Sequence, residues 1–295
     1  MENATTAFEA DAVNSMKPAT LRKYKLLFRQ FKAYCETKNI TNLNQLTVPV
    51  VRDFRNSWKL SPRTAGKHLE RLKRFFNFCL ENNWLKTSPA TALRVGKFTE
   101  SEVVPFTEEE VEKILKACDE RKTDKDALTQ SRRLRLLAEF MLATGLRIGD
   151  AVMLSTDKFI KDGSGYSLVL RTAKTGSDVT CPIPTPLAKS IMAVGPRPFW
   201  TGNSTTDACA SLWRKVFADA FEQAKVDGHP HQFRHVFAKR LLMSGIPVGL
   251  VLVLLGHSKV STTERHYSKW VRERQSVLSD AVRKSWEKAQ NSRNS

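Results

Sequence analysis

The chain has 295 residues, enough for one large domain or two ordinary ones, and its 48 lysines and arginines against 30 acidic residues give a net charge of +18. This balance favours a polyanionic partner, with nucleic acid ahead of an anionic membrane. The five cysteines are scattered and form no C-x-x-C pair, which argues against a zinc knuckle or a disulfide framework. The first 16 residues lack the apolar core of a signal peptide, and the longest apolar run, Val248–Leu255, is far below the ~20 residues that span a bilayer. We therefore expect a cytoplasmic protein, associated with the nucleoid or in a host cytoplasm if the source is viral, that binds no membrane.

The N-terminal third of the chain is predicted to be a helical bundle. Residues 1–16 are polar and small, so we expect them to be disordered. Apolar stripes at helical spacing predict three helices, one from Ala19, one after Thr47 and one that opens at Ser61-Pro62. Residues 1–100 hold 18 basic and 8 acidic residues, a net charge of +10. Residues 17–95 are thus predicted to form a small bundle with a basic surface.

A linker and a second domain follow the bundle. Gly96 and Pro105 interrupt the helical pattern, so residues 96–106 are predicted to be the linker. The run Thr107 to Glu110 is a capping box that opens a helix, and a longer helix is expected from about Thr129 to Leu142. Gly145 is then predicted to take a positive φ angle, which places Arg147 at the start of a short helix. Asp150 lies three residues further on, near enough to orient Arg147.

One β-hairpin is expected in the second domain. Residues 166–172 and 179–183 alternate apolar and polar side chains, and Pro182 and Pro184 mark the return strand as an edge. Helices are predicted again over residues 185–193 and after a cap at Thr206, and Val248–Leu255 is apolar nearly all round, which predicts a core helix. Residues 290–295 are expected to be disordered. The predicted fold class is therefore mainly α with a small antiparallel β-sheet, in which an α+β domain over residues 107–289 follows the bundle.

Most of the histidines lie in one stretch, from His229 to Tyr267. It opens as His-Pro-His-Gln-Phe-Arg-His, in which Pro230 suits the first turn of a helix. His231 and Arg234 are three residues apart, so they share one face of that helix. Gly256 is expected to end the next helix, and a short capped helix is expected to deliver Tyr267. Imidazole, guanidinium and phenol groups in so short a span indicate a reactive site. The histidines concerned are His229, His231, His235, His257 and His266.

The chemistry that suits these groups is attack on a phosphodiester. A phenol is a poor nucleophile near neutral pH because its reference pKa is about 10, but nearby cations favour the phenolate. Guanidinium groups match phosphate oxygens with two parallel hydrogen bonds and stabilise an anionic transition state. Attack by a tyrosine would give a covalent phosphotyrosine that keeps the bond energy for religation.

These residues resemble the tyrosine recombinase (phage integrase) family. The run Ala143-Thr144-Gly145-Leu146-Arg147-Ile148-Gly149-Asp150 is similar to the family's first arginine box, and His231-Gln232-Phe233-Arg234-His235 is similar to its His-x-x-Arg-His box. Leu255-Gly256-His257 and Tyr267 complete an ordered set over roughly residues 106–289. The resemblance implies a core-binding domain and a catalytic domain that close on double-stranded DNA.

The resemblance also implies a role for each site residue in a site-specific recombinase that needs neither ATP nor a metal cofactor. Tyr267 forms a 3′-phosphotyrosyl link, and His231 acts as the general base toward it. A lysine on the β-hairpin protonates the leaving 5′-oxygen; Lys174 is the candidate, with Arg171 a weaker one. The groups that hold the non-bridging oxygens are Arg147, Arg234 and His257, supported by His235 and Asp150.

Two sets of contacts with partners follow from the same resemblance. The first domain is expected to contact DNA through Arg63, Thr64, Lys67 and Arg71, which lie on the basic side of one helix. Apolar residues from Trp270 to Trp286 lie roughly on one side of a final helix. In the family such a tail packs against a neighbouring protomer, which implies a tetramer on paired DNA sites; the tail could equally fold back on its own domain.

Three other functions compete with recombination. A metal site at His231 and His235 is disfavoured because no H-E-x-x-H motif is present and Arg234 would repel a cation. A type IB topoisomerase-like nicking-closing enzyme would use similar catalytic residues. A non-catalytic DNA-binding protein on the same scaffold is disfavoured because every catalytic candidate is present.

Overall fold

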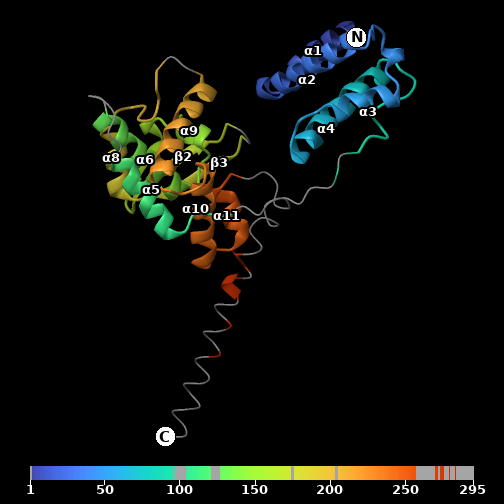
Figure 1. Ribbon diagram of the computed structural model, residues 1–295. Helices are drawn as coiled ribbons and strands as arrows, with labels where there is room; N and C mark the ends of the chain where they lie inside the picture. The colour runs from blue at the N-terminus through green and yellow to red at the C-terminus, as the bar shows by residue number, and fades with distance from the viewer. Residues whose placement is uncertain are drawn as a thin grey trace. The chain divides into compact units, whose positions relative to one another are not determined.

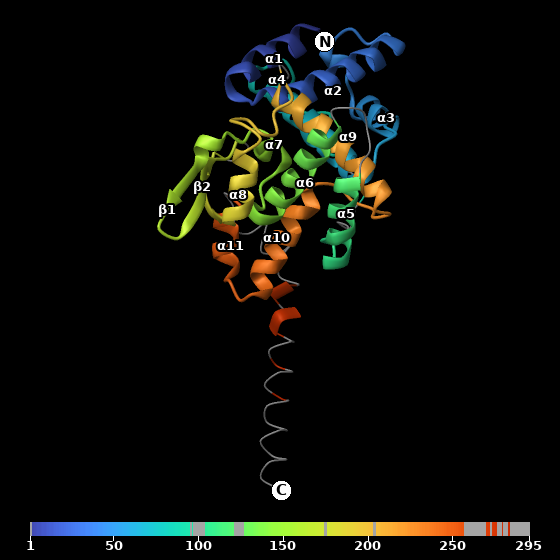
Figure 2. The ribbon, with the colours of Figure 1, turned by 90° about the vertical axis from the view of Figure 1, so that its left-hand side faces the viewer.

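The chain forms two units, residues 1–101 and 102–295, shown as ribbons in Figures 1 and 2. The computed structural model describes residues 2–94, 96, 104–120, 127–173, 176–202, 205–256, 270, 271, 273–275, 279 and 283. Across these residues the fold is mainly helical with one small antiparallel sheet, and the predicted fold class is therefore confirmed. Most of the expected linker, and the expected disordered tail at 290–295, lie outside the described residues.

The first unit is a helical bundle around an aromatic core. Its helices are α1 (Glu2–Ser15), α2 (Pro18–Thr37), α3 (Val48–Asn56) and α4 (Pro62–Glu81), with a short 3-10 helix at Leu43–Gln45. The last three helices begin close to the residues predicted, although Thr47 makes no side-chain cap to α3. Rings from α2, α3 and α4 meet in the core, which holds Phe28, Phe31, Phe54, Phe75 and Phe76.

The prediction that residues 1–16 are disordered is wrong, because Glu2–Ser15 form helix α1. Helix α1 packs against α2 and α4 through Phe8, which is 3% exposed. The Phe8 ring meets the rings of Tyr24 and Phe28 with centroids 5.0 and 5.4 Å apart. Small residues complete the buried face, so a single aromatic ring provides most of its apolar surface, and a stripe that thin is easily missed in the sequence.

The second unit is organised around the central helix α6 (Ala127–Thr144). Helix α6 contacts α5, α7, α8, α9, α10 and strand β3, and its inward face includes Leu137, Phe140 and Met141, each fully buried. The predicted capping box is confirmed, because Thr107 N–H donates to Glu110 and Glu110 N–H donates to Thr107 Oγ1. The surrounding helices are α5 (Glu108–Glu120), α7 (Ile148–Ala151), α8 (Thr185–Met192), α9 (Thr206–Gln223), α10 (His231–Met243) and α11 (Val248–Leu254).

The sheet has three antiparallel strands in the order β1–β2–β3. Strands β2 (Gly165–Arg171) and β3 (Asp178–Ile183) are the predicted hairpin, and β3 lies at an edge as its prolines indicate. Strand β1 (Phe159–Asp162), which follows a 3-10 turn at Thr156–Lys158, was not predicted. It has only four residues, of which Phe159 alone is buried, so it carries no alternating pattern.

Two other predictions about helices need correction. Helix α9 is capped by Thr205 rather than Thr206, since Thr205 Oγ1 accepts from Ala208 N–H. Helix α11 is not buried all round: Val251 and Leu252 are buried, whereas Leu250 and Val253 are 57% and 65% exposed. The helix packs against α10 and β3, which cover only one of its sides. None of the described helices is both long and apolar enough to cross a membrane.

Candidate active site

Arg147 is positioned by the sharp turn that ends helix α6. Gly145 has the predicted positive φ, 63°, and a Cβ added there would lie 2.4 Å from Phe237 of α10 and 2.8 Å from Leu255. Only glycine allows this conformation and this close approach together. The turn hands the chain to α7, and the Arg147 carbonyl accepts hydrogen bonds from Asp150 and Ala151 N–H at 2.9 Å. Arg147 is therefore the N-cap of α7, as predicted.

The Arg147 guanidinium is half-buried and without a hydrogen-bond partner at Nη1, which is itself inaccessible to solvent. Among the described residues no carboxylate pairs with it. A buried cationic donor that lacks a partner is costly, and an anion that fills the site would remove that cost. Arg147 is thus prepared for an anionic ligand.

Arg234, on the first turn of α10, differs from Arg147 because its guanidinium is already bonded to the backbone. It is 1% exposed, and its Nη1 donates to the Gly145 carbonyl at 2.8 Å while Nη2 donates to the Leu255 carbonyl at 2.7 Å. These two carbonyls belong to the turn before Arg147 and to the end of α11. Arg234 therefore fixes the distance between two segments that carry other predicted site residues, Arg147 and His257.

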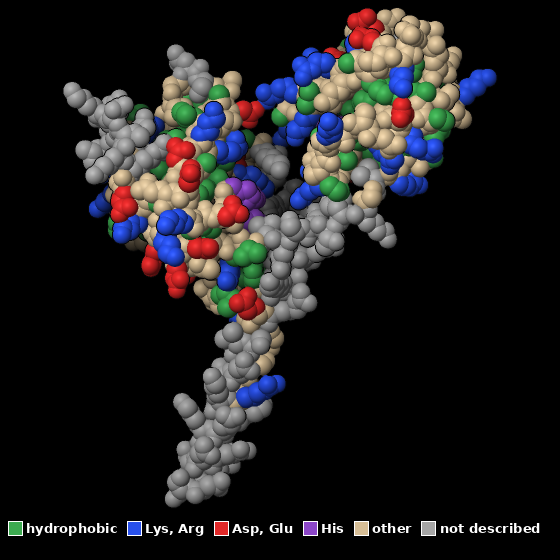
Figure 3. Space-filling model, in the orientation of Figure 1, with side chains coloured by type: hydrophobic (Ala, Val, Ile, Leu, Met, Phe, Trp, Pro, Cys, Tyr) green, Lys and Arg blue, Asp and Glu red, His purple; other side chains and the backbone are tan. Residues whose placement is uncertain are grey.

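Three histidines gather at the start of α10. The His231 ring lies 4.9 Å from that of His235, at 90°, and 6.4 Å from that of His229. Figure 3 shows histidine side chains together on the surface of this unit, beside basic side chains. Among the described residues no three histidine, cysteine or acidic side chains are grouped so that they could hold a metal ion.

His231 is neutral at physiological pH. Desolvation by the surrounding protein, together with the charges of His235, Arg234 and Arg147, lowers the pKa of His231 to about 3. The residue still reaches solvent. A neutral imidazole near pH 7 has a free lone pair that can accept a proton, but the lowered pKa makes His231 a weaker base than an ordinary histidine.

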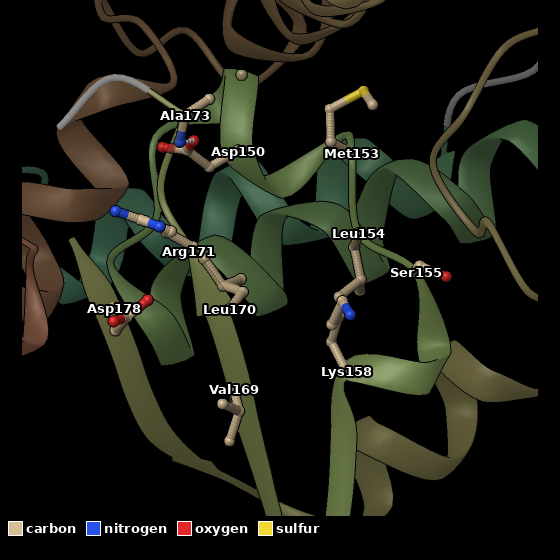
Figure 4. Close-up of a pocket in the computed structure, with 11 residues that line it drawn as sticks. Asp150, Met153, Leu154, Ser155, Lys158, Val169, Leu170, Arg171, Ala173 and Asp178 are labelled. Atoms are coloured by element: carbon tan, nitrogen blue, oxygen red, sulfur yellow. Dashed lines mark hydrogen bonds between the residues drawn. The ribbon is translucent and has the colours of Figure 1, made fainter. Parts of the chain in front are cut away.

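Asp150 holds the β2–β3 turn. We expected this carboxylate to orient Arg147, but its Oδ1 accepts a hydrogen bond from the Ala173 N–H at 2.9 Å, and no ion pair joins it to Arg147 in the described part of the chain. Figure 4 shows the Asp150 carboxylate at the Ala173 backbone, above a pocket of about 460 Å³ that Arg171 also lines. Arg171 is exposed, and its Nε donates to the Gly176 carbonyl at 2.8 Å.

The structure brings Arg147, Arg234, His231 and His235 together and connects Asp150 to the hairpin. Three other predicted residues, Lys174, His257 and Tyr267, lie outside the described residues. Their described neighbours in sequence are Ala173 and Gly176, Gly256, and Trp270.

Two residues near the site, Gly256 and Trp270, make contacts that were not predicted. Gly256 has a φ of 60°, and a Cβ there would lie 3.1 Å from Val179 and 3.2 Å from Thr172, so the residue before His257 packs on the base of the hairpin. Trp270 is 5% exposed in a cluster formed by α10, α11 and β3, with its ring 6.5 Å from His235. Only two features of the sequence pointed to these contacts: the glycine inside the Leu-Gly-His motif, and a tryptophan three residues after Tyr267.

In the first unit, α4 carries the predicted DNA-contacting residues on its outer side. Arg63, Thr64 and Lys67 are exposed, and Arg71 is half-exposed. They follow one another at helical spacing, while Leu69 and Leu72 face the core. Figure 3 shows Lys and Arg side chains spread over the visible face of this unit.

Comparisons with known proteins cover both units. A model of the phage integrase family matches residues 105–274, and one of a phage integrase SAM-like domain matches residues 4–95. The chain is 29% identical over 214 residues to tyrosine recombinase XerA of Pyrococcus furiosus, which covers 69% of either chain. It is 28% identical over 273 residues to tyrosine recombinase XerD of Mycobacterium tuberculosis, covering 83% of this chain and 85% of the relative.

Solved structures show the same fold. A lambda integrase dimer bound to a COC′ core site matches with a TM-score of 0.71 and 18% identity, over 88% of this chain and 95% of that one. A lambda integrase tetramer bound to a Holliday junction matches with a TM-score of 0.69 and 18% identity, over 88% and 77% of the two chains. XerH recombinase bound to a difH substrate in a post-cleavage complex matches with a TM-score of 0.70 and 17% identity, over 88% and 79%.

Proposed function

Because the chain belongs to the phage integrase family, we propose that it is a site-specific DNA recombinase that cleaves and rejoins strands through a 3′-phosphotyrosyl link at Tyr267. The observation that carries this proposal is the buried, unpartnered Nη1 of Arg147 beside a neutral His231 and the fixed guanidinium of Arg234. An anion with several oxygens fits such a group, and a phosphodiester is the anion that the charge of +18 would attract.

The reaction begins with attack of the Tyr267 oxygen on one backbone phosphorus. A new O–P bond forms, the bond from phosphorus to the 5′-oxygen breaks, and the phenolic proton passes to His231. Arg147, Arg234 and His257 stabilise the charge that grows on the non-bridging oxygens. Arg234 already donates to two carbonyls, so we expect Arg147 to make the stronger contact with phosphate.

The leaving 5′-oxygen takes a proton from Lys174, or from Arg171 if the hairpin presents that residue instead. Attack by a 5′-hydroxyl from another strand then reverses these steps and reseals the DNA. The energy of the broken bond is kept in the phosphotyrosyl link, so the cycle needs no ATP and no resident metal.

Double-stranded DNA is the proposed partner of both units. Arg63, Thr64, Lys67 and Arg71 would bind backbone phosphates from the first unit, so replacing Lys67 with alanine should lower the slope of log binding constant against log salt by about 0.9. We propose that the enzyme acts in the cytoplasm, on nucleoid or viral DNA.

Exchange between two sites requires several protomers. The lambda integrase relatives were solved as a dimer on a core site and as a tetramer on a Holliday junction. We propose a tetramer on paired sites, joined by the C-terminal segment. Trp270 packs into its own unit, so the segment that passes to a neighbour would begin after it.

A covalent adduct tests the proposed function. The Tyr267→Phe variant would select its binding site from random duplexes, and a nicked duplex of the selected sequence would then be incubated with the wild-type chain. We expect a protein–DNA adduct with the wild type and none with Tyr267→Phe, which should still bind. Binding without any wild-type adduct would favour the non-catalytic alternative, and relaxation of supercoiled DNA that lacks the site would favour the topoisomerase-like one.

A further inference from the structure

Gln232, the second residue of the His-x-x-Arg-His box, uses both ends of its amide. Its Oε1 accepts a hydrogen bond from the His229 N–H at 2.7 Å, and its Nε2 donates to the Val104 carbonyl at 3.0 Å, 128 residues away in sequence. Only a side chain that carries an acceptor and a donor on one planar group can make both bonds. No role was predicted for this residue from the sequence.

The bond to His229 closes the turn that leads into α10. The Gln232 N–H donates in return to the His229 carbonyl at 3.0 Å. This pair resembles half of a capping box, in which a glutamine side chain reaches back three residues to a backbone N–H. The closed turn contains Pro230, which is buried, and His231, the first residue of the helix. The amide is therefore one of the contacts that set where His231 lies.

The bond to Val104 attaches this turn to a segment that is anchored in the core of the second unit. Phe106 is 3% exposed. Its ring lies 5.5 Å from that of Phe221 on α9 and 5.4 Å from that of Phe233 on α10. The carbonyl that accepts from Gln232 thus belongs to a segment that the aromatic core already holds.

Gly228 leaves room for both the ring and the amide. A Cβ added there would lie 2.4 Å from the Phe106 ring and 2.5 Å from Gln232 Oε1. Both distances are far below ordinary van der Waals contact, so a larger residue at this position would displace the amide, the ring or both. A glycine is needed here for close packing.

We infer that Gln232 is a positioning residue, which ties the first turn of α10 to Val104 and thereby holds the His231 ring in place. The inference rests on the proposed function, in which His231 takes the phenolic proton. A base must lie within hydrogen-bond reach of the proton that it takes, and a displacement of about 1 Å can cost about 100-fold in rate. Loss of the amide therefore slows proton transfer, while Arg234 keeps its two bonds to backbone carbonyls.

The acidity of His231 reports where its ring lies, and it can be measured without DNA. Its pKa is lowered to about 3 by desolvation and by the charges of four neighbours, His235, Arg234, Arg147 and His229. A ring that moves outward gains water and distance from these groups, so its pKa rises toward the ordinary value of about 6.5. A variant that is only less stable keeps the wild-type pKa in its folded state.

The experiment removes the amide in Gln232→Met, which keeps the length of the side chain and loses both hydrogen bonds. In an NMR titration of the full-length chain, we expect His231 of this variant to bind protons at least about tenfold more tightly than in the wild type. Single-turnover cleavage of the nicked duplex should be at least about tenfold slower, because reach matters before basicity and a higher proton affinity offsets only part of the loss. Binding of that duplex should be unchanged.

Two further variants serve as a second perturbation and a matched control. Gly228→Ala pushes a methyl group toward the same amide without altering it, and should change the pKa of His231 and the cleavage rate in the same directions as Gln232→Met. Gln223→Met makes the same chemical change at an exposed residue of α9, and should match the wild type in both measurements.

Three results would overturn the inference. The pKa of His231 could be unchanged in Gln232→Met, which would mean that the amide has no hold on the ring. The pKa could rise while the cleavage rate stays at the wild-type value, or Gln223→Met could show the same changes as Gln232→Met. If the wild type forms no adduct on the nicked duplex, the proposed function fails, whereas the titration still decides whether the amide holds His231.

Discussion

Replacing either arginine of the site by alanine should change the stability of the second unit in different ways. Both substitutions are expected to abolish cleavage. Arg234→Ala, however, leaves the Gly145 and Leu255 carbonyls, which now accept at 2.8 and 2.7 Å, buried without a donor. Arg147→Ala leaves no described protein group without its partner, since Nη1 has none. The comparison therefore separates a structural contribution from a purely catalytic one.

The magnitude follows from the two carbonyls. An orphaned buried acceptor costs about 1–3 kcal/mol, so Arg234→Ala should destabilise the second unit by about 3 kcal/mol or more. Removal of the buried cation itself returns part of its desolvation cost, but the cavity left by this large, fully buried side chain opposes that gain. Arg147→Ala removes an unpaired cation, so its stability should be unchanged or raised by up to about 1 kcal/mol.

Thermal unfolding of the full-length variants measures the difference. For a unit of this size about 1 kcal/mol corresponds to about 2–4 °C, so Arg234→Ala should lower the transition of the second unit by about 6–12 °C. Arg234→Lys keeps the charge, but its single ammonium group cannot reach both carbonyls, so its melting temperature should lie between those of the wild type and Arg234→Ala. Equal melting temperatures for Arg234→Ala and Arg147→Ala would refute the reasoning, because the two carbonyl bonds would then contribute nothing net.

Three further outcomes follow from the structure. His231 should stay neutral down to about pH 4 in an NMR titration assigned with His231→Gln. The pKa of His231 is about 3 in the folded chain and about 6.5 in the unfolded chain, so the folded state binds fewer protons between pH 3 and pH 6.5. The contribution of His231 to stability is therefore complete above about pH 6.5 and is lost as the pH falls toward about 3. Gly145→Ala should destabilise the second unit by at least about 1 kcal/mol, since it combines a positive φ with a 2.4 Å overlap, whereas Gly149→Ala meets nothing within 4 Å and should be neutral or stabilising in thermal unfolding. Phe8→Ala should cost the first unit about 3–5 kcal/mol in denaturant unfolding, and Val13→Ala, at a side chain 60% exposed on the same helix, close to nothing.

The parts of the fold that the sequence predicted correctly depend on residues close together in the chain. The capping box needs only Thr107 and Glu110, three residues apart. Gly145 lies between a long apolar stripe and a short one, which indicates a turn with a positive φ. The hairpin shows alternating apolar residues on both sides of a polar turn. In each case the interaction that sets the structure lies within the motif itself.

The parts that were missed depend on contacts between distant residues. Helix α1 is held by the ring of Phe8 against rings of α2 and α4, and nothing near Phe8 in sequence indicates this burial. The exposed side of α11 depends on which elements cover it, and not on its apolar composition. Asp150 could be placed near Arg147 by spacing alone, but its partner Ala173 is 23 residues away.

The same limit explains why Arg147 and Arg234 appear equivalent in the sequence but not in the structure. Each lies inside a recognisable motif, and each has a guanidinium group suited to bind phosphate. The Arg234 guanidinium, however, donates to the backbone on either side of the site, at Gly145 and Leu255. Those carbonyls belong to the first arginine box and to the Leu-Gly-His motif, so Arg234 of the His-x-x-Arg-His box holds the other two motifs at a fixed separation before any DNA arrives. Because Arg147 lacks such contacts at Nη1, it keeps a donor for the phosphate. We therefore propose a division of labour, in which Arg234 assembles the pocket and Arg147 binds the anion.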